Sequence, residues 1–475
     1  MAKHIYRKAL ALALTTICLL VWCAPVSAIS IKEEQELSQQ FMRMISRHFS
    51  LIDDPLIIDY VSQMGRKIIS SLPPQPFTYH FYVIKEDVYN AFAIPAGYIF
   101  VNSGLLLAMD NEEELAGILS HEIAHVVCRH ISHRIDRSKK IDLASAAGMV
   151  AGIFLGVAGG SAAAAQAMAI GSVAAGQTMS LAYSREDESQ ADQLGLGYLD
   201  QTDYSAQGLL DILKKIRGKQ WFGSDQVPTY MMTHPAVEER IVAIDTWMAT
   251  TKERGAVPNQ KRRPSAEFRR MQYRLRALYG APDSVAQYFK SGMEQNPSNI
   301  DWTYGYGLAL ARTGHRKEAL GYLQKVLAKD ALDPVTLGDL GKVYFEGGQI
   351  NDALRVLQGL DSLPGTNPEG LFYLGRTHME LGGYSAAAEV FERLVQRQEE
   401  YTPTYRFLGE TYGKLERLPE AHYFLGIYHF RKGEDRIAFY HLAHAQKGIQ
   451  DPAKLETIKQ ILEIIGKLPK EEEKQ

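Results

Sequence analysis

The chain has 475 residues, a length that suggests about three domains. Its 46% hydrophobic and 23% charged residues are typical of globular proteins that bury a core. The formal net charge is −3, so the chain is not basic overall. We therefore expect no nucleic-acid partner.

The N-terminus has the pattern of a secretory signal peptide. A basic stretch at residues 3–8 precedes an uncharged apolar run of 14 residues from Ala9 to Trp22, and residues 26–28 (VSA) offer a small-x-small cleavage site. The apolar run is short for a membrane-spanning helix. We therefore expect residues 1–28 to be a signal peptide that is removed from an exported protein.

A helical segment followed by two strands is expected before residue 110. Apolar spacing predicts helical structure over residues 32–70. Aromatic and β-branched residues predict strands at 77–84 and 98–102, on either side of a loop at 90–97. A long helix is expected to begin near Asp110, which has capping-box spacing from an acidic residue three positions later.

Residues 143–184 form an uncharged segment rich in alanine and glycine. Three interpretations fit it: a pair of buried helices, a mobile helical lid over an active site, and a transmembrane hairpin. Small residues make the segment only mildly apolar, which disfavours the hairpin. Its position between the histidine-rich stretch at 119–130 and the acidic stretch at 183–192 favours the lid.

Residues 249–265 have the composition of a linker and lie in a basic part of the chain. A solvated linker is the favoured interpretation. The alternative is contact with an acidic partner or a peripheral contact with an anionic membrane surface.

The C-terminal half contains a repeat of 34 residues. Glycine and alanine recur with this period, at Gly307, Gly341, Gly375 and Gly409 and at Ala319, Ala353, Ala387 and Ala421. This period, with small residues where helices cross, is typical of tetratricopeptide (TPR) repeats, which bind peptides or proteins on a concave face. We expect a separate N-terminal domain over 29–248, an all-α TPR solenoid over 266–468 and a polar tail at 469–475. A purely structural spacer is the alternative for the solenoid.

The stretch from Leu119 to His130, LSHEIAHVVCRH, contains an HExxH motif. Positions four apart lie on one face of a helix, so His121 and His125 can bind the same metal ion. Glu122 lies beside them and is suited to act as a general base toward water. The motif predicts a hydrolase with one zinc ion per subunit, although other divalent ions suit the same ligands.

A catalytic zinc ion also needs a third protein ligand. The metzincin spacing would require histidine at position 131, where Ile131 stands. His130 and His133 are out of that register, and we interpret them as residues at the surface or in contact with the metal ligands.

A later helix offers a glutamate as the third ligand. In the segment SREDESQAD, Ser184 and Asp187 can cap the helix, and Glu188 and Asp192 then share one face. Glu188 can bind zinc, and Asp192 can accept the other N–H group of a ligand histidine and so fix its tautomer.

These motifs together resemble those of a known family. HEIAH, SREDESQAD and THPAVEER (233–240) look like motifs of the HtpX-like and CAAX-prenyl-protease-like gluzincins, and NAFAIPAGYIFVNSGLL (90–106) resembles the hairpin before them. The resemblance covers about residues 50–248 and implies an α+β zincin fold with a small β-sheet. It implies zinc binding by the two HExxH histidines and Glu188. It also implies that the strand at 98–102 is the edge strand that pairs with an extended peptide substrate.

The signal peptide and the TPR tail narrow the resemblance to periplasmic members that act in outer-membrane protein assembly. It then implies that His234 can close the zinc site as a fourth ligand and that Arg240 lies near the site, where it would stabilise an oxyanion. A structural His-Pro turn and a helix-surface arginine are the alternatives. The implied partners on the TPR face are unfolded or stalled outer-membrane proteins and the β-barrel assembly machinery.

The sequence therefore favours a mainly α-helical periplasmic zinc endopeptidase, with its zinc-peptidase domain over 29–248 and a chaperone-like TPR domain after it. A non-proteolytic TPR scaffold for envelope protein assembly is the main alternative. An integral membrane protease anchored by residues 143–184 is a weaker one.

Overall fold

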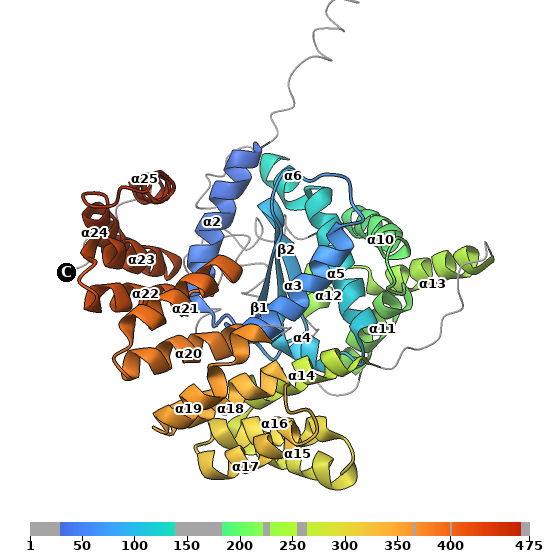
Figure 1. Ribbon diagram of the computed structural model, residues 1–475. Coiled ribbons are helices and arrows are strands. Elements are labelled where there is room, and N and C mark those ends of the chain that lie inside the picture. The colour runs from blue at the N-terminus through green and yellow to red at the C-terminus, as the bar shows by residue number, and fades with distance from the viewer. Residues whose placement is uncertain are drawn as a thin grey trace, which may run out of the picture.

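The computed structural model describes residues 29–137, 183–221, 229–253, 264–363, 367–399 and 401–466. These residues are mainly helical and include one three-stranded sheet, followed along the chain by helical repeats (Figure 1), which confirms the predicted fold class. The predictions for the signal peptide, for nearly all of segment 143–184 and for the polar tail lie outside the described residues.

The helical segment predicted at 32–70 consists of two helices, α2 (Ile31–His48) and α3 (Pro55–Ile69). The Ser30 side chain caps α2, and the Asp54 side chain accepts hydrogen bonds from two backbone N–H groups in the first turn of α3. A cap at each start explains why the pattern is interrupted between the two helices.

The sheet has the order β1-β3-β2, so two sequence predictions were wrong. β3 (Tyr98–Asn102) pairs in parallel with β1 (His80–Ile84) and antiparallel with β2 (Ala91–Ile94). Residues 90–97, expected as a loop, therefore contain a strand, and 98–102 is a central strand instead of the substrate-pairing edge. All four β2 residues are buried, and periodicity cannot identify so short an apolar run as a strand.

Helix α5 (Glu112–Val127) occupies the centre of the N-terminal part (Figure 1). Asn111, and not the predicted Asp110, caps α5, because the Asn111 side chain accepts hydrogen bonds from the backbone N–H groups of Glu113 and Glu114. α5 packs against α3, β2, β3, η1 (Pro95–Gly97), α6 (His130–Arg137), α10 (Arg185–Asp200) and α11 (Gln207–Trp221). α12 (Thr229–Thr233) and α13 (Val237–Glu253) pack on α11, and α4 (Ser103–Ala108) packs on β3.

Gly117 allows α11 to pack closely on α5. A Cβ atom at Gly117 would lie 2.6 Å from the backbone nitrogen of Leu209 and 2.7 Å from its Cα atom. We expect Gly117→Ala to lower the free energy of unfolding by about 1–3 kcal/mol through overpacking, as measured by urea denaturation. Gly197→Ala is the control, because a Cβ atom there meets nothing within 4 Å. Equal destabilisation by both variants would contradict this explanation.

The repeat array is built from paired helices that begin with α14. They are α14 (Ala266–Tyr279), α15 (Pro282–Gln295), α16 (Ile300–Arg312), α17 (Arg316–Leu327), α18 (Pro334–Glu346), α19 (Ile350–Leu357), η4 (Leu360–Ser362), α20 (Pro368–Glu380), α21 (Tyr384–Arg397), α22 (Pro403–Lys414), α23 (Leu418–Arg431), α24 (Asp435–Ala445) and α25 (Pro452–Gly466). The predicted linker at 249–265 begins inside α13 and ends at Ser265, the cap of α14. Residues 254–263 are not described.

The recurring glycines explain why the paired helices cross so closely. A Cβ atom at Gly341 would lie 2.3 Å from the Leu357 side chain, and one at Gly375 would lie 2.5 Å from the Phe391 ring. The same kind of contact occurs between Gly426 and Leu442 in the last unit. The repeated glycine therefore makes room for the bulky residue that recurs on the next helix.

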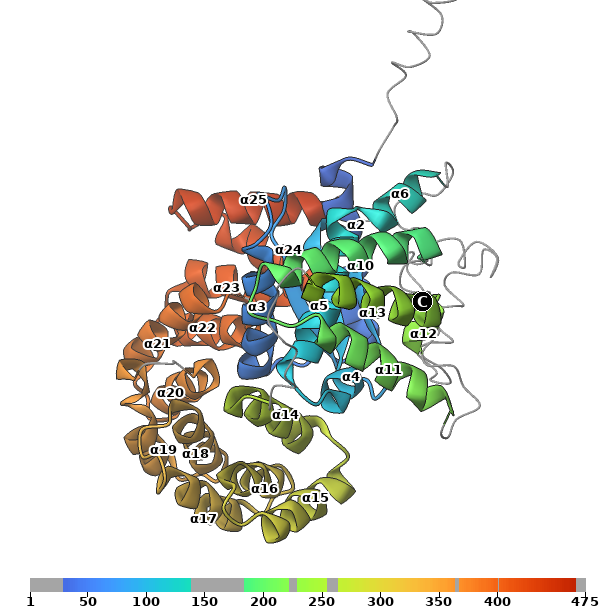
Figure 2. The same cartoon turned by 90° about the vertical axis from the view of Figure 1, so that its right-hand side faces the viewer.

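The array curves along one side of the N-terminal part (Figure 2), and α14 and α20 both contact α3. Arg274 of α14 is buried at this junction. Its Nε atom lies 2.7 Å from Asp54 Oδ2 and its Nη1 atom 2.6 Å from Asp339 Oδ1, and it also pairs with Glu369. One arginine thus joins the cap of α3 to α18 and α20. No helix in the described ranges combines the length and hydropathy that a membrane crossing requires.

Candidate metal centre

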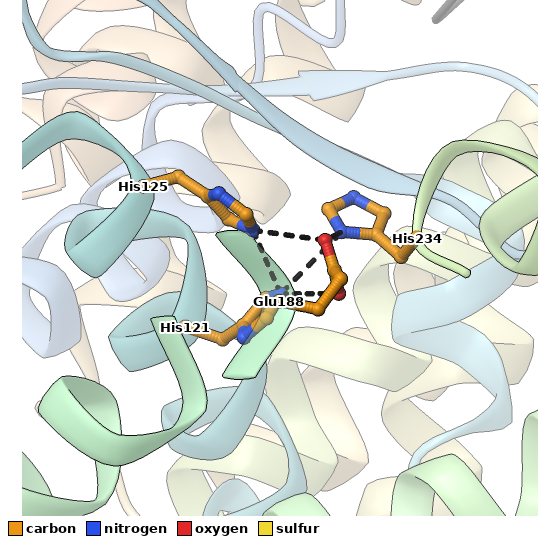
Figure 3. A group of neighbouring side chains, drawn as sticks. All are labelled: His121, His125, Glu188 and His234. Atoms are coloured by element: carbon orange, nitrogen blue, oxygen red, sulfur yellow. Dashed lines mark hydrogen bonds and ion pairs between the residues drawn. The ribbon is translucent and has the colours of Figure 1, made fainter. Parts of the chain in front are cut away.

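Four buried side chains converge on one point in the N-terminal part (Figure 3). His121 and His125 come from α5, Glu188 from α10, and His234 from the turn after α12. One ligand atom from each lies within 4.8 Å of the others. No other set of three or more histidine, cysteine or acidic residues converges in this way within the part of the chain that the structure describes.

The distances in this group suit ligands of a single ion. His121 Nε2 lies 3.0 Å from His125 Nε2 and 3.4 Å from His234 Nδ1. Glu188 Oε1 lies 3.3 Å from His125 Nε2 and 3.1 Å from His234 Nδ1. Nitrogen and oxygen ligands at about 2.0–2.2 Å from a zinc ion have similar mutual separations. The group therefore fits a metal of this kind.

Local sequence explains how α10 reaches α5. The reciprocal hydrogen bonds of Ser184 and Asp187 form a capping box at the start of α10. Gly195 lets the two helices approach closely, because a Cβ atom at this position would lie only 3.2 Å from the backbone nitrogen of His121. Glu188, one turn into α10, then faces the HExxH histidines.

The turn that carries His234 is strained. Ala236, two residues later, has a φ angle of 63°, a left-handed conformation that costs a non-glycine residue about 1–2 kcal/mol. The backbone N–H group of His234 donates to the Tyr230 carbonyl at 2.7 Å, and the Tyr230 ring stacks on the imidazole. These contacts hold His234 in the group despite the strain.

Asp192 and Arg240 support the group from behind. Asp192 Oδ1 lies 2.9 Å from His121 Nδ1, which leaves His121 Nε2 facing the centre. The Arg240 guanidinium donates to both oxygens of Asp192 at 2.8 Å, and its Nη1 atom lies 2.6 Å from Glu188 Oε2. Burial alone would raise the pKa of Glu188, but Arg240, His234 and His121 hold it well below its ordinary value. Arg240 thus pairs with the carboxylates of both Asp192 and Glu188 and orients them.

Glu122 has an unusual environment. Both of its carboxylate oxygens are buried and accept no hydrogen bond from the described residues. The His234 ring lies beside it, with Nε2 3.5 Å from Oε1. Burial raises the pKa of Glu122, and His234 and His121 lower it. A buried carboxylate without donors is costly, so it indicates a place for water or a ligand beside the metal position.

His130 and Tyr183 both contact His125. The sequence predicted no definite role for either residue. His130 is buried, and its Nδ1 atom lies 2.8 Å from His125 Nδ1, whereas His133 is exposed. The Tyr183 ring stacks on His125 at 3.7 Å, and its hydroxyl donates to the Ala93 carbonyl at 3.1 Å. Tyr183 directly precedes the cap of α10, but no spacing rule identified it.

The outer edge of β2 lies beside the group. The Asn90 carbonyl accepts a hydrogen bond from the β3 residue Asn102, so the alternate carbonyls of Ala91 and Ala93 face away from β3. His234 Nε2 lies 3.2 Å from the Ala91 carbonyl, and Tyr183 takes the Ala93 carbonyl. Side chains of the site therefore occupy both outward acceptors.

A helix with HExxH, a glutamate from a second helix and a small sheet beside them define a metalloprotease, and the comparisons agree. Residues 57–248 match the model of Peptidase family M48, and residues 339–402 match a tetratricopeptide repeat. The protein is a metalloprotease whose N-terminal part is similar to Peptidase family M48 and whose C-terminal part contains helical repeats similar to tetratricopeptide repeats.

The chain is also similar to several curated proteins. The chain is 26% identical over 382 residues to the Beta-barrel assembly-enhancing protease of Escherichia coli (strain K12), covering 77% of this chain and 74% of that protein. It is 27% identical over 288 residues to a Putative beta-barrel assembly-enhancing protease of Vibrio cholerae, covering 60% and 57%. It is 27% identical over 192 residues to Mitochondrial metalloendopeptidase OMA1 of Schizosaccharomyces pombe, covering 40% and 52%.

Proposed function

We propose that this protein is a periplasmic zinc endopeptidase that acts during assembly of outer-membrane β-barrel proteins. The observation that carries the proposal is the buried group of His121, His125, Glu188 and His234 beside Glu122, whose carboxylate has no donor among the described residues. The name of the Escherichia coli relative supports the process, and the signal-peptide pattern at residues 1–28 supports the compartment.

The proposed roles follow from the contacts. His121, His125 and Glu188 hold the ion, Asp192 fixes the tautomer of His121, and Arg240 orients Asp192 and Glu188. When bound, zinc supplies Lewis acidity to the scissile carbonyl and to the attacking water. Glu122 accepts the proton of that water and returns it to the leaving amine. This assignment departs from the expectation that Arg240 stabilises an oxyanion, because its guanidinium already pairs with two carboxylates.

The proposed substrate position is the outer edge of β2. An extended peptide would add as a further strand and donate to the outward carbonyls of Ala91 and Ala93. In the described conformation His234 and Tyr183 take these carbonyls, so a bound peptide must displace both side chains. The conformation therefore corresponds to a latent enzyme.

We expect His234→Ala to cleave casein faster than the parent while it keeps its metal. The substitution removes one ring that occupies both the metal position and the Ala91 carbonyl. Initial cleavage rates and zinc content, measured side by side, test this. His133→Ala, which changes an exposed histidine of α6, is the control and should behave as the parent. Slower cleavage with zinc retained would instead make His234 a catalytic group.

A non-proteolytic role of the repeats in assembly is the second candidate, favoured by the extent of the TPR array. We propose that the array binds unfolded outer-membrane proteins or the β-barrel assembly machinery. Incubating the purified protein with an unfolded outer-membrane β-barrel protein separates the two candidates. Cleavage dependent on zinc supports the protease, whereas binding that prevents aggregation without cleavage supports the scaffold.

A further inference from the structure

Four histidines form a second cluster, on the repeat array. α23 contributes His422 and His429, and α24 contributes His441 and His444. His422 Nδ1 lies 2.9 Å from His441 Nδ1. The His444 ring stacks on His422 with centroids 5.1 Å apart, and the His429 ring stacks on His441 at 5.4 Å. The proposed peptidase mechanism uses none of these residues.

We propose that His422, His441 and His444 form a second metal site, for a late first-row divalent cation such as Zn²⁺ or Ni²⁺. The separation of the two Nδ1 atoms resembles the 3.0 Å between His121 Nε2 and His125 Nε2 in the candidate metal centre. Two imidazole nitrogens at about 2.0–2.1 Å from one ion can adopt such a separation. Imidazole ligands select these cations over Mg²⁺ and Ca²⁺, which prefer oxygen.

The third ligand requires rotation of one side chain. His444 lies three residues after His441 on α24, so both histidines project from the same face. His444 is exposed, and its Nδ1 atom contacts the Tyr440 carbonyl of its own helix at 2.8 Å. Rotation about its side-chain bonds releases that contact and turns the ring nitrogens toward the Nδ1 pair.

His429 has a supporting position instead. Its Nδ1 atom lies 2.5 Å from Glu434 Oε2, which holds the imidazole parallel to His441. An ion held by His422 and His441 would connect α23 to α24 across the last repeat. The outer surface of α24 also carries the exposed apolar residues Ile437, Phe439 and Tyr440. Metal binding would therefore stiffen the helix that presents this surface.

Metal stoichiometry tests the site on the full-length mature protein. We expect equilibrium dialysis against micromolar free zinc, followed by elemental analysis, to give two ions per chain for the parent. The double variant His422→Ala/His441→Ala should retain one, and its circular dichroism should match that of the parent. His315→Ala, which changes an exposed histidine of another repeat, is the matched control and should retain two.

A second probe distinguishes this site from the candidate metal centre. Glu188→Ala should lose the buried ion and keep the repeat-bound ion, so the two assignments fail independently. Replacing His422 and His441 in Glu188→Ala should remove the repeat-bound ion as well, so that this triple variant retains no zinc. The proposal is overturned if the parent binds one ion at saturation, because the Nδ1 contact is then only a histidine–histidine hydrogen bond. The proposal is also overturned if His422→Ala/His441→Ala binds two ions.

Discussion

Glu122→Gln is expected to abolish peptide cleavage and to leave the metal in place. Glutamine preserves the shape of the side chain, but it cannot accept a proton from water. Loss of a positioned general base typically lowers the rate by about 10²- to 10⁴-fold. The measurement is the initial rate of casein cleavage together with the zinc content of the same preparation.

The control for this prediction is Glu186→Gln. Glu186 lies in the first turn of α10 and is exposed, so its replacement removes the same charge without touching the buried group. Cleavage by Glu122→Gln at the parent rate would contradict the role of Glu122. In cells, full assembly of β-barrel proteins by Glu122→Gln would favour the scaffold function.

The second large effect is expected for Arg274→Met. The arginine is buried among Asp54, Asp339 and Glu369, so methionine would leave these carboxylates without their shared partner. Burial already raises the pKa of Asp54 to about 6 although Arg274 lowers it, which reflects the cost of a charge at this position. Breaking a buried ion pair typically costs about 3–5 kcal/mol, and we expect a loss of this size in urea unfolding.

Arg355→Met provides a matched control for that experiment. Arg355 forms an ion pair with Asp352 on the surface of α19, and exposed pairs contribute about 0–1 kcal/mol. Arg274→Lys should also destabilise, because the guanidinium reaches Asp54 and Asp339 from two different nitrogen atoms and lysine has only one. An Arg274→Met protein as stable as Arg355→Met would contradict a stabilising junction.

The site was accessible to sequence reasoning where local spacing determines geometry. His121 and His125 share a helix face because they are four residues apart. The Ser184 cap fixes where α10 begins, and the positions of its side chains around the helix follow from that start. The repeat glycines were recognisable for the same reason, since each faces a bulky residue at a constant offset. These features depend on helix geometry, which does not change with the rest of the fold.

Tertiary contacts account for what the sequence did not reveal. The β2 run is only four residues long, and its burial in the sheet, not its pattern, makes it a strand. Arg274 meets Asp54 across 220 positions of sequence and Glu369 across 95, so no local pattern connects them. Tyr183 likewise reaches Ala93 across 90 positions. Only the strand order of the structure shows that β2, and not β3, is an edge strand of the sheet.

The central claim is that His121, His125 and Glu188 hold a catalytic zinc ion. Its most direct test is zinc content and casein cleavage in the parent, Glu188→Ala and Glu186→Ala, each carrying His422→Ala/His441→Ala so that an ion on the repeats is not counted. We predict that the parent and Glu186→Ala retain one zinc ion, lose cleavage with a chelator and regain it with zinc. Glu188→Ala should lack both zinc and cleavage. Cleavage by zinc-free parent, or by Glu188→Ala at the parent rate, would contradict the account.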